Sequence, residues 1–135
     1  MANGETNITQ VGSVTVPVSD QERALDFYVN KLGFEKRLDV PYGDGDRWLA
    51  VAPRGSATSI SIVPPREGDS VGVETRVMFL TADADAEHEG LLARGVDVDE
   101  QVLRMGGPVP PMFSFRDLDG NKFSIVEQPS GTLTA

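Results

Sequence analysis

The sequence predicts an α+β fold in which two tandem βαβββ modules form a curved mixed sheet around a groove, with the helices on its outer face. Two observations support this prediction: the order of strand-like and helix-like segments occurs twice, and equivalent positions recur at a nearly constant offset. Positions 63 residues apart pair Val14 with Val77, Asp20 with Asp83 and Ser61 with Ser124. A period this long indicates paired modules and not a solenoid.

The first module, residues 8–63, begins with a strand and a capped helix. Residues 11–18 alternate apolar and polar side chains, as a half-buried strand does. Ser19 or Asp20 can cap the helix that follows, Ser19 as part of a capping box with Glu22, and Gly33 ends it. Turns that contain Pro and Gly then separate three further strand segments, 34–40, 47–52 and 58–63.

The second module, residues 73–128, repeats this order after a linker rich in Pro, Gly and charge at 64–72. A strand at 75–81 precedes a helix that Asp83 caps and Gly95 ends. The remaining strand-like pieces are 96–99, 102–105, 112–115 and 122–127. Residues 1–7 and 129–135 read as loose terminal tails.

Composition narrows the function classes. The net charge of −9 disfavours nucleic-acid binding, because an acidic surface repels phosphate. It would attract a cationic ligand, although net charge relates first to solubility. No apolar run reaches the roughly 20 residues needed to span a bilayer, and the polar N-terminus does not resemble a signal peptide. The chain has no cysteine, which excludes disulfides and thiolate chemistry, and a cytoplasmic location is expected.

Strand alternation assigns side chains to two faces of the predicted sheet. One set is apolar and should pack against the helices: Val14, Val16, Val18, Ile60, Ile62, Val77, Phe79, Phe123 and Ile125. The opposite set is partly polar and therefore suits a solvent-filled groove: Ser13, Thr15, Ser59, Ser61, Arg76, Met78, Leu80, Lys122, Ser124 and Val126.

Three segments of the first module, 13–20, 23–28 and 32–35, resemble the vicinal oxygen chelate superfamily. This superfamily contains glyoxalase I, bleomycin-resistance proteins and extradiol dioxygenases. The segment 115–121 resembles its final loop, with Leu118 in place of the usual Pro. The resemblance extends from Ile8 to Gln128 and implies the fold above, a small-molecule ligand in the groove and a homodimer. It leaves the activity open, because one fold hosts many functions.

The resemblance also implies a divalent metal held by four side chains, which fall here on Ser13, Ser61, Arg76 and Ser124. None is a usual ligand: serine hydroxyls are weak donors and a charged guanidinium cannot coordinate. We therefore expect no metal or other cofactor, unless the strand register is misread by one residue. The only histidine, His88, reads as a mid-helix residue at the core edge or in solvent.

The expected groove residues combine small polar groups, apolar walls and one strong anchor. They are Ser13, Thr15, Trp48, Ser61, Arg76, Met78, Met112, Phe113 and Ser124. Arg76 can bind an anionic group of a ligand or form a salt bridge with a neighbour such as Glu74. The Gly- and Pro-rich segment 105–113 can act as a lid or as a simple connector. No catalytic residue is identifiable, because no Ser, His and Asp arrangement is present.

Three functions remain open at this point. The first is a metal-free protein that binds or sequesters a small molecule. The second is a metal-dependent lyase, isomerase or dioxygenase, which the resemblance alone favours. The third is a metal-free enzyme in which Arg76 stabilises an oxyanion. Whether the chain is an enzyme is therefore undecided, as are the identity of the ligand and whether a dimer would exchange modules.

Overall fold

Two four-stranded mixed sheets form the framework of the computed structural model, which describes residues 4–43 and 45–128. The first sheet has the strand order β1-β4-β3-β2 and consists of β1 (Ser13–Pro17), β2 (Glu35–Tyr42), β3 (Asp46–Ala52) and β4 (Ser59–Val63). The second has the order β5-β8-β7-β6 and consists of β5 (Glu74–Thr81), β6 (Asp97–Val98), β7 (Met112–Arg116) and β8 (Lys122–Glu127). The predicted pair of βαβββ modules is confirmed.

The two sheets follow the same pairing scheme. The first and last strands of each module pair in parallel, and the remaining pairs are antiparallel. Thr15 lies opposite Ser61 in the first module, and Met78 lies opposite Ser124 in the second. Both residues of the second pair stand 63 positions after those of the first, so the repeat offset describes spatial equivalence here.

Each helix begins at an aspartate cap. The Asp20 carboxylate accepts a hydrogen bond from the Arg23 amide and starts α1 (Gln21–Asp26), which continues as a π-helical turn over Phe27–Lys31. Asp83 does the same for α2 (Ala84–Ala93). The capping box expected at Ser19 and Glu22 does not form. The Ser19 hydroxyl instead donates to Asp119, a partner 100 residues away that local sequence cannot indicate.

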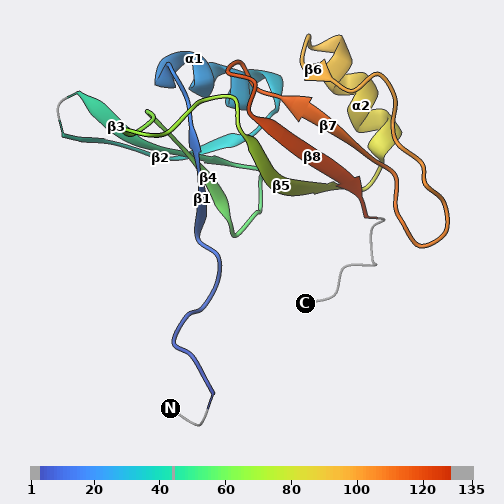
Figure 1. The fold of residues 1–135 in the computed structure, drawn as a ribbon, viewed down its shortest axis with the longest axis horizontal. Coiled ribbons are helices and arrows are strands. Elements are labelled where there is room, and N and C mark those ends of the chain that lie inside the picture. The colour runs from blue at the N-terminus through green and yellow to red at the C-terminus, as the bar shows by residue number, and fades with distance from the viewer. Residues whose placement is uncertain (1–3, 44, 129–135) are drawn as a thin grey trace.

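Both helices lie on the same side of the sheets, as Figure 1 shows with α1 and α2 above the strands. The side chains predicted to face them are buried in one core cluster or packed against it. Phe34 and Tyr28 of the first module contact Phe79 and Phe123 of the second through aromatic edges, with ring centroids 5.2 and 6.2 Å apart. The modules therefore share one core.

A buried polar network also joins the modules through the turn between β7 and β8. The Tyr28 hydroxyl donates to Asp117 over 2.7 Å. Asn121 is fully buried: its amide nitrogen donates to the Pro17 carbonyl and to Asp117, and its carbonyl accepts from the Gly72 and Val73 amides. Burial, together with the nearby Asp117 carboxylate, raises the pKa of Tyr28 well above its usual value.

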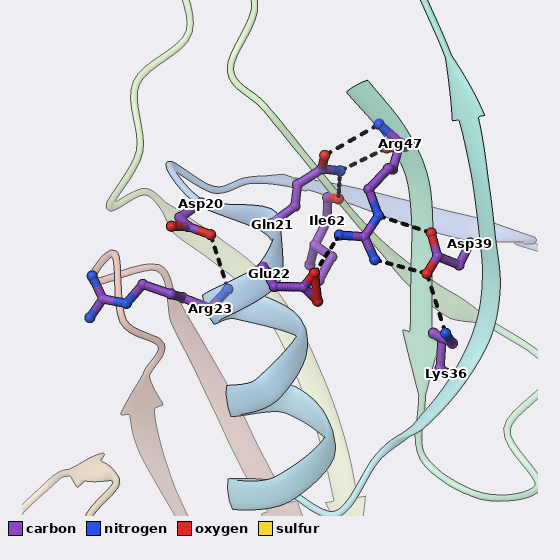
Figure 2. A network of polar contacts seen from close by, with 8 residues as sticks. All are labelled: Asp20, Gln21, Glu22, Arg23, Lys36, Asp39, Arg47 and Ile62. Atoms are coloured by element: carbon purple, nitrogen blue, oxygen red, sulfur yellow. Dashed lines mark hydrogen bonds and ion pairs between the residues drawn. The ribbon is translucent and has the colours of Figure 1, made fainter. Parts of the chain in front are cut away.

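A second polar network holds α1 against the β2–β3 hairpin (Figure 2). The Gln21 amide donates to the carbonyls of Arg47 and Ile62. The Arg47 guanidinium donates to Asp39 at 2.8 and 3.0 Å and to Glu22 at 3.0 Å. The hydrogen bond from Arg47 lowers the pKa of Asp39 to about 2. This network is structural, since Asp39 pairs with the core residue Leu49 and so faces the helix side.

The strand predicted at 102–105 is wrong. Only Leu103 forms a bridge, to Met112, and a turn closed by a bond from the Val109 amide to the Gly106 carbonyl follows. The three prolines at 108, 110 and 111 lack amide protons, so a regular ladder cannot form beside them. The C-terminal tail predicted at 129–135, and residues 1–3 of the N-terminal one, lie outside the described residues.

Candidate functional site

The faces of the two sheets turned away from the helices carry the candidate site. We call this surface the open face, and its members follow from the strand pairing and alternation. The first sheet contributes Ser13, Thr15, Trp48 and Ser61, and the second contributes Arg76, Met78, Leu80, Met112 and Ser124. Eight of the nine residues predicted for the groove therefore share one side of the fold.

Phe113 is the exception among the predicted groove residues. It is 2% exposed, belongs to the core cluster and packs edge-on against His88 of α2, with ring centroids 5.0 Å apart. Adjacent residues of a strand point to opposite faces, so Met112 and Phe113 cannot both line the groove. His88 occupies the expected place at the core edge, where its Nε2 donates to the Asp99 carbonyl.

Ser13 and Ser61 of the first sheet are hydrogen-bonded to each other. The hydroxyl oxygens of Ser13 and Ser61 lie 2.6 Å apart in a hydrogen bond. Ser61 is 1% exposed, whereas Ser13 and Thr15 reach the surface. This part of the open face is thus a small, weakly polar floor with one satisfied buried hydroxyl.

The second sheet differs at Arg76 because β5 is bulged there. Glu74 pairs with Lys122 and Met78 with Ser124, so four steps along β5 match two steps along β8. Arg76 lies at the centre of this bulge. Its φ of 62° falls in the left-handed region, which residues other than glycine rarely adopt. The Thr75 hydroxyl supports the bulge by donating to the Lys122 carbonyl over 2.6 Å and accepting from the Val77 amide.

The Arg76 guanidinium carries no ion pair or hydrogen bond with the described part of the chain. The salt bridge to Glu74, one of the two alternatives for Arg76, does not form. Glu74 is placed 3.8 Å from the Lys122 ammonium instead. Arg76 is exposed, and so are Met78 and Leu80 beside it, at 58% and 53%. A free cation therefore stands next to an apolar strip.

The divalent metal that the resemblance implies does not fit the four side chains at its positions. Ser13 and Ser61 bind each other, Ser124 is a neutral hydroxyl, and Arg76 is a cation. Such a set offers no carboxylate or imidazole donor. Within residues 4–43 and 45–128, no group of three or more His, Asp or Glu side chains is arranged to hold a metal ion.

A cavity of about 590 Å³ lies at the end of the open face where the linker meets the first sheet. Thr15 and Pro17 of β1 and Val63 of β4 line one side. Arg66 and Asp69 lie among the linker residues that line the other side. Since Asn121 ties Pro17 to Gly72, this cavity adjoins the start of β5 and the strand that carries Arg76. Of the predicted groove residues, Thr15 lines it.

The segment 105–111, expected as a lid or a connector, projects beyond the edge of the second sheet in Figure 1. Arg104 at its base is ion-paired with Asp85 of α2, which anchors this end of the loop on the helix side.

Comparison with known proteins finds close relatives. The model of the Glyoxalase/Bleomycin resistance protein/Dioxygenase superfamily matches residues 10–125. The uncharacterized protein YetH of Bacillus subtilis is 32% identical over 121 residues, which cover 89% of this chain and 99% of YetH. The structure of TnmS3, an antibiotic-binding protein from Streptomyces sp. CB03234, superposes with a TM-score of 0.81 at 38% identity and covers 93% of this chain and 100% of TnmS3.

A second solved structure agrees with the first in fold and length. A member of the same superfamily from Sphaerobacter thermophilus has a TM-score of 0.81 and 37% identity, and covers 90% of this chain and 98% of its own. The duplicated βαβββ fold, the family model and these two likenesses are consistent with one another. The chain therefore belongs to the glyoxalase/bleomycin resistance protein/dioxygenase superfamily.

Proposed function

We propose that this protein binds a small molecule on the open face and sequesters it without chemical conversion. The observation that carries the proposal is the likeness to TnmS3, an antibiotic-binding protein that shares 38% of its sequence and nearly the whole of its length with this chain. The open face supports it with small polar side chains, apolar strips and a cavity of about 590 Å³, a size in the range of ligand sites.

Binding proceeds without a metal in this proposal. The usual side-chain ligands of divalent metals are carboxylates, imidazoles and thiolates, whereas the positions that the family implies hold three serines and an arginine here. The positive charge of Arg76 would also oppose a bound cation. The side chains that an enzyme of this family would need for metal chemistry are thus replaced by side chains suited to contact a ligand.

We further propose a homodimer in the cytoplasm. Two apolar side chains on the open-face side of β2, Leu38 and Val40, are 39% and 44% exposed, and a second copy would cover them. The chain has no cysteine, which suits a reducing compartment. No helix in the described part of the chain has the length and apolarity needed to cross a membrane.

The test combines metal analysis with ligand binding by the purified protein. A library of small molecules that includes polycyclic antibiotics is screened by thermal shift. Each hit is then recovered from the protein, and its mass is measured by mass spectrometry to detect any chemical change. We expect hits that return unchanged, less than stoichiometric divalent metal, and loss of the shift in Thr15→Trp, which fills the cavity at β1. Ala93→Trp, which adds the same side chain to the exposed surface of α2, should keep it.

Two results would overturn the proposal. One is a hit that the protein converts to a product over repeated turnovers. The other is stoichiometric zinc, nickel, manganese or iron whose removal abolishes binding, which would favour the metal-dependent enzymes of the family.

A further inference from the structure

We propose that the bulge around Arg76 is a built anchor for an anionic oxygen, so that the ligand is a flat apolar molecule bearing a carboxylate or phenolate. This inference rests on the proposed function and specifies the class of ligand. It assigns Arg76 to direct contact with the ligand and makes Thr75 a positioning residue.

The bulge is an organised structure and not a local fraying of β5. Two extra residues would leave a backbone amide and a carbonyl of the ladder without partners. The Thr75 side chain supplies both, since its hydroxyl donates to the Lys122 carbonyl and accepts from the Val77 amide. The alternation of β5 also survives, because Val77 and Phe79 pack on the core while Arg76 and Met78 are exposed.

The bulge holds the backbone of Arg76 in a strained, left-handed conformation. Arg76 is the non-glycine residue with positive φ among residues 4–43 and 45–128. Left-handed backbone is unfavourable for a side chain that bears a Cβ, and such positions cluster at ligand sites. An exposed loop or turn that merely needed positive φ would be served by glycine, as at Gly72 and Gly120 nearby.

The guanidinium of Arg76 has no ion-pair partner in the described part of an acidic chain. Among residues 4–43 and 45–128, eight of the twelve Lys and Arg side chains form ion pairs, in a chain that has 21 acidic residues. Arg76 stays unpaired although Glu74 is only two residues away on the same face, because the Lys122 ammonium lies 3.8 Å from that carboxylate. The guanidinium is left available to an oxygen that the protein does not supply.

The neighbours of Arg76 define the remainder of the ligand. Met78 and Leu80 continue the same exposed row along β5, and Ser124 lies opposite Met78. A flat apolar body can lie on this row while a carboxylate accepts two parallel hydrogen bonds from the guanidinium. A cationic ligand, which net charge alone would favour, would be repelled at this point.

The experiment uses a matched pair of probes, 2-naphthoate and 2-naphthamide, which share shape and differ in charge. Binding to ¹⁵N-labelled protein is followed by NMR up to millimolar concentration. We expect naphthoate to bind about tenfold more tightly than the amide, which is the difference expected for one charge-assisted contact. Its binding should also shift the Arg76, Met78 and Ser124 resonances. Arg76→Gln should remove this preference, so that the affinity for naphthoate falls to about that for the amide.

Two further variants separate position from charge. Arg23→Gln deletes an exposed, unpaired arginine of α1 on the helix side and should keep the tenfold preference. Thr75→Val deletes the hydroxyl that holds the bulge and should lower the ratio of naphthoate to amide affinity from about ten toward one. Thr75→Ser keeps the hydroxyl and should keep the preference. A merely structural role of Thr75 would instead weaken both probes equally.

The possible outcomes separate this inference from the proposed function. Equal binding of both probes on the open face, unchanged in Arg76→Gln, would refute the anion anchor and leave ligand binding standing. An equal loss of preference in Arg23→Gln would refute it too, since the effect would then be one of net charge. If neither probe shifts any open-face resonance, the anion anchor is refuted, and the library screen alone then decides the proposed function.

Discussion

The two modules share one pairing scheme, and two of their differences, in the first strand and in the last turn, bear on the site and on stability. In the first module β1 pairs with β4 without interruption and the turn before β4 lies at the surface. In the second module β5 is bulged at Arg76, and the turn before β8 places two buried polar side chains, Asp117 and Asn121, between the modules. The second copy thus carries both the strained arginine and the connection that unites the fold. The following variants test this division, from the largest expected effect to the smallest.

Asn121→Ala should cause the largest loss of stability. It removes four hydrogen bonds that involve buried or half-buried backbone groups and the Asp117 carboxylate, at a cost of about 3 kcal/mol. Thr58→Ala, at the position 63 residues earlier, deletes one exposed bond and should cost about 0.5–1 kcal/mol. Urea unfolding of both variants measures the difference, and equal losses would show that the turns are equivalent.

Tyr28→Phe should cost about 1–2 kcal/mol, because it removes a donor to Asp117 in a buried network. The variant should also change the alkaline profile. The folded-state pKa of Tyr28 is raised, so above about pH 10 the unfolded chain ionises this hydroxyl while the folded chain does not, and stability falls. Chemical unfolding between pH 9 and 11 should reveal this decline in the wild type and a smaller one in Tyr28→Phe.

Arg76→Gly should raise stability by about 1 kcal/mol, because glycine adopts positive φ without strain. Ser13→Gly, the counterpart 63 residues earlier in an unbulged strand, should lower stability by about 0.5–1 kcal/mol. Opposite signs in thermal unfolding would support a difference between the two first strands. A loss in both variants would mean that Arg76 makes stabilising contacts and is not strained.

Asp39→Asn should have the smallest effect, and one that depends on pH. The pKa of Asp39 is lowered to about 2 in the folded protein, so its stabilising charge is present at neutral pH and is lost as the pH falls from about 4 to about 2. The difference in Tm between wild type and variant should shrink over that range. A difference that stays constant down to pH 2 would contradict the role of the Arg47 ion pair.

Much of the fold could be predicted because equivalent core and cap residues of the two modules lie at a constant offset in the sequence. The offset of 63 predicts the equivalence of Ser61 with Ser124, which the strand pairing bears out, and the aspartate caps mark both helix starts. The bulge could not be found in this way. Two added residues preserve the alternation of β5, so hydrophobic pattern alone cannot reveal them.

The candidate site was predicted less completely, for reasons of geometry. Met112 and Phe113 were both assigned to the groove although neighbouring strand residues face opposite sides, and Phe113 lies in the core. The long-range bonds of Ser19 and Asn121 join residues about 100 positions apart, which no local motif indicates. The support of Thr75 for Arg76 appears only once the strands are paired.

The paired insertion in β5 bears on how such a protein can evolve. A single added residue would turn the rest of the strand over and bring Arg76 or Met78 into the core. Two added residues change what the outer surface presents while every core neighbour keeps its place. The second module therefore presents a cation on the ligand-facing surface where the first module presents Ser13, and the core packing of the two modules stays equivalent.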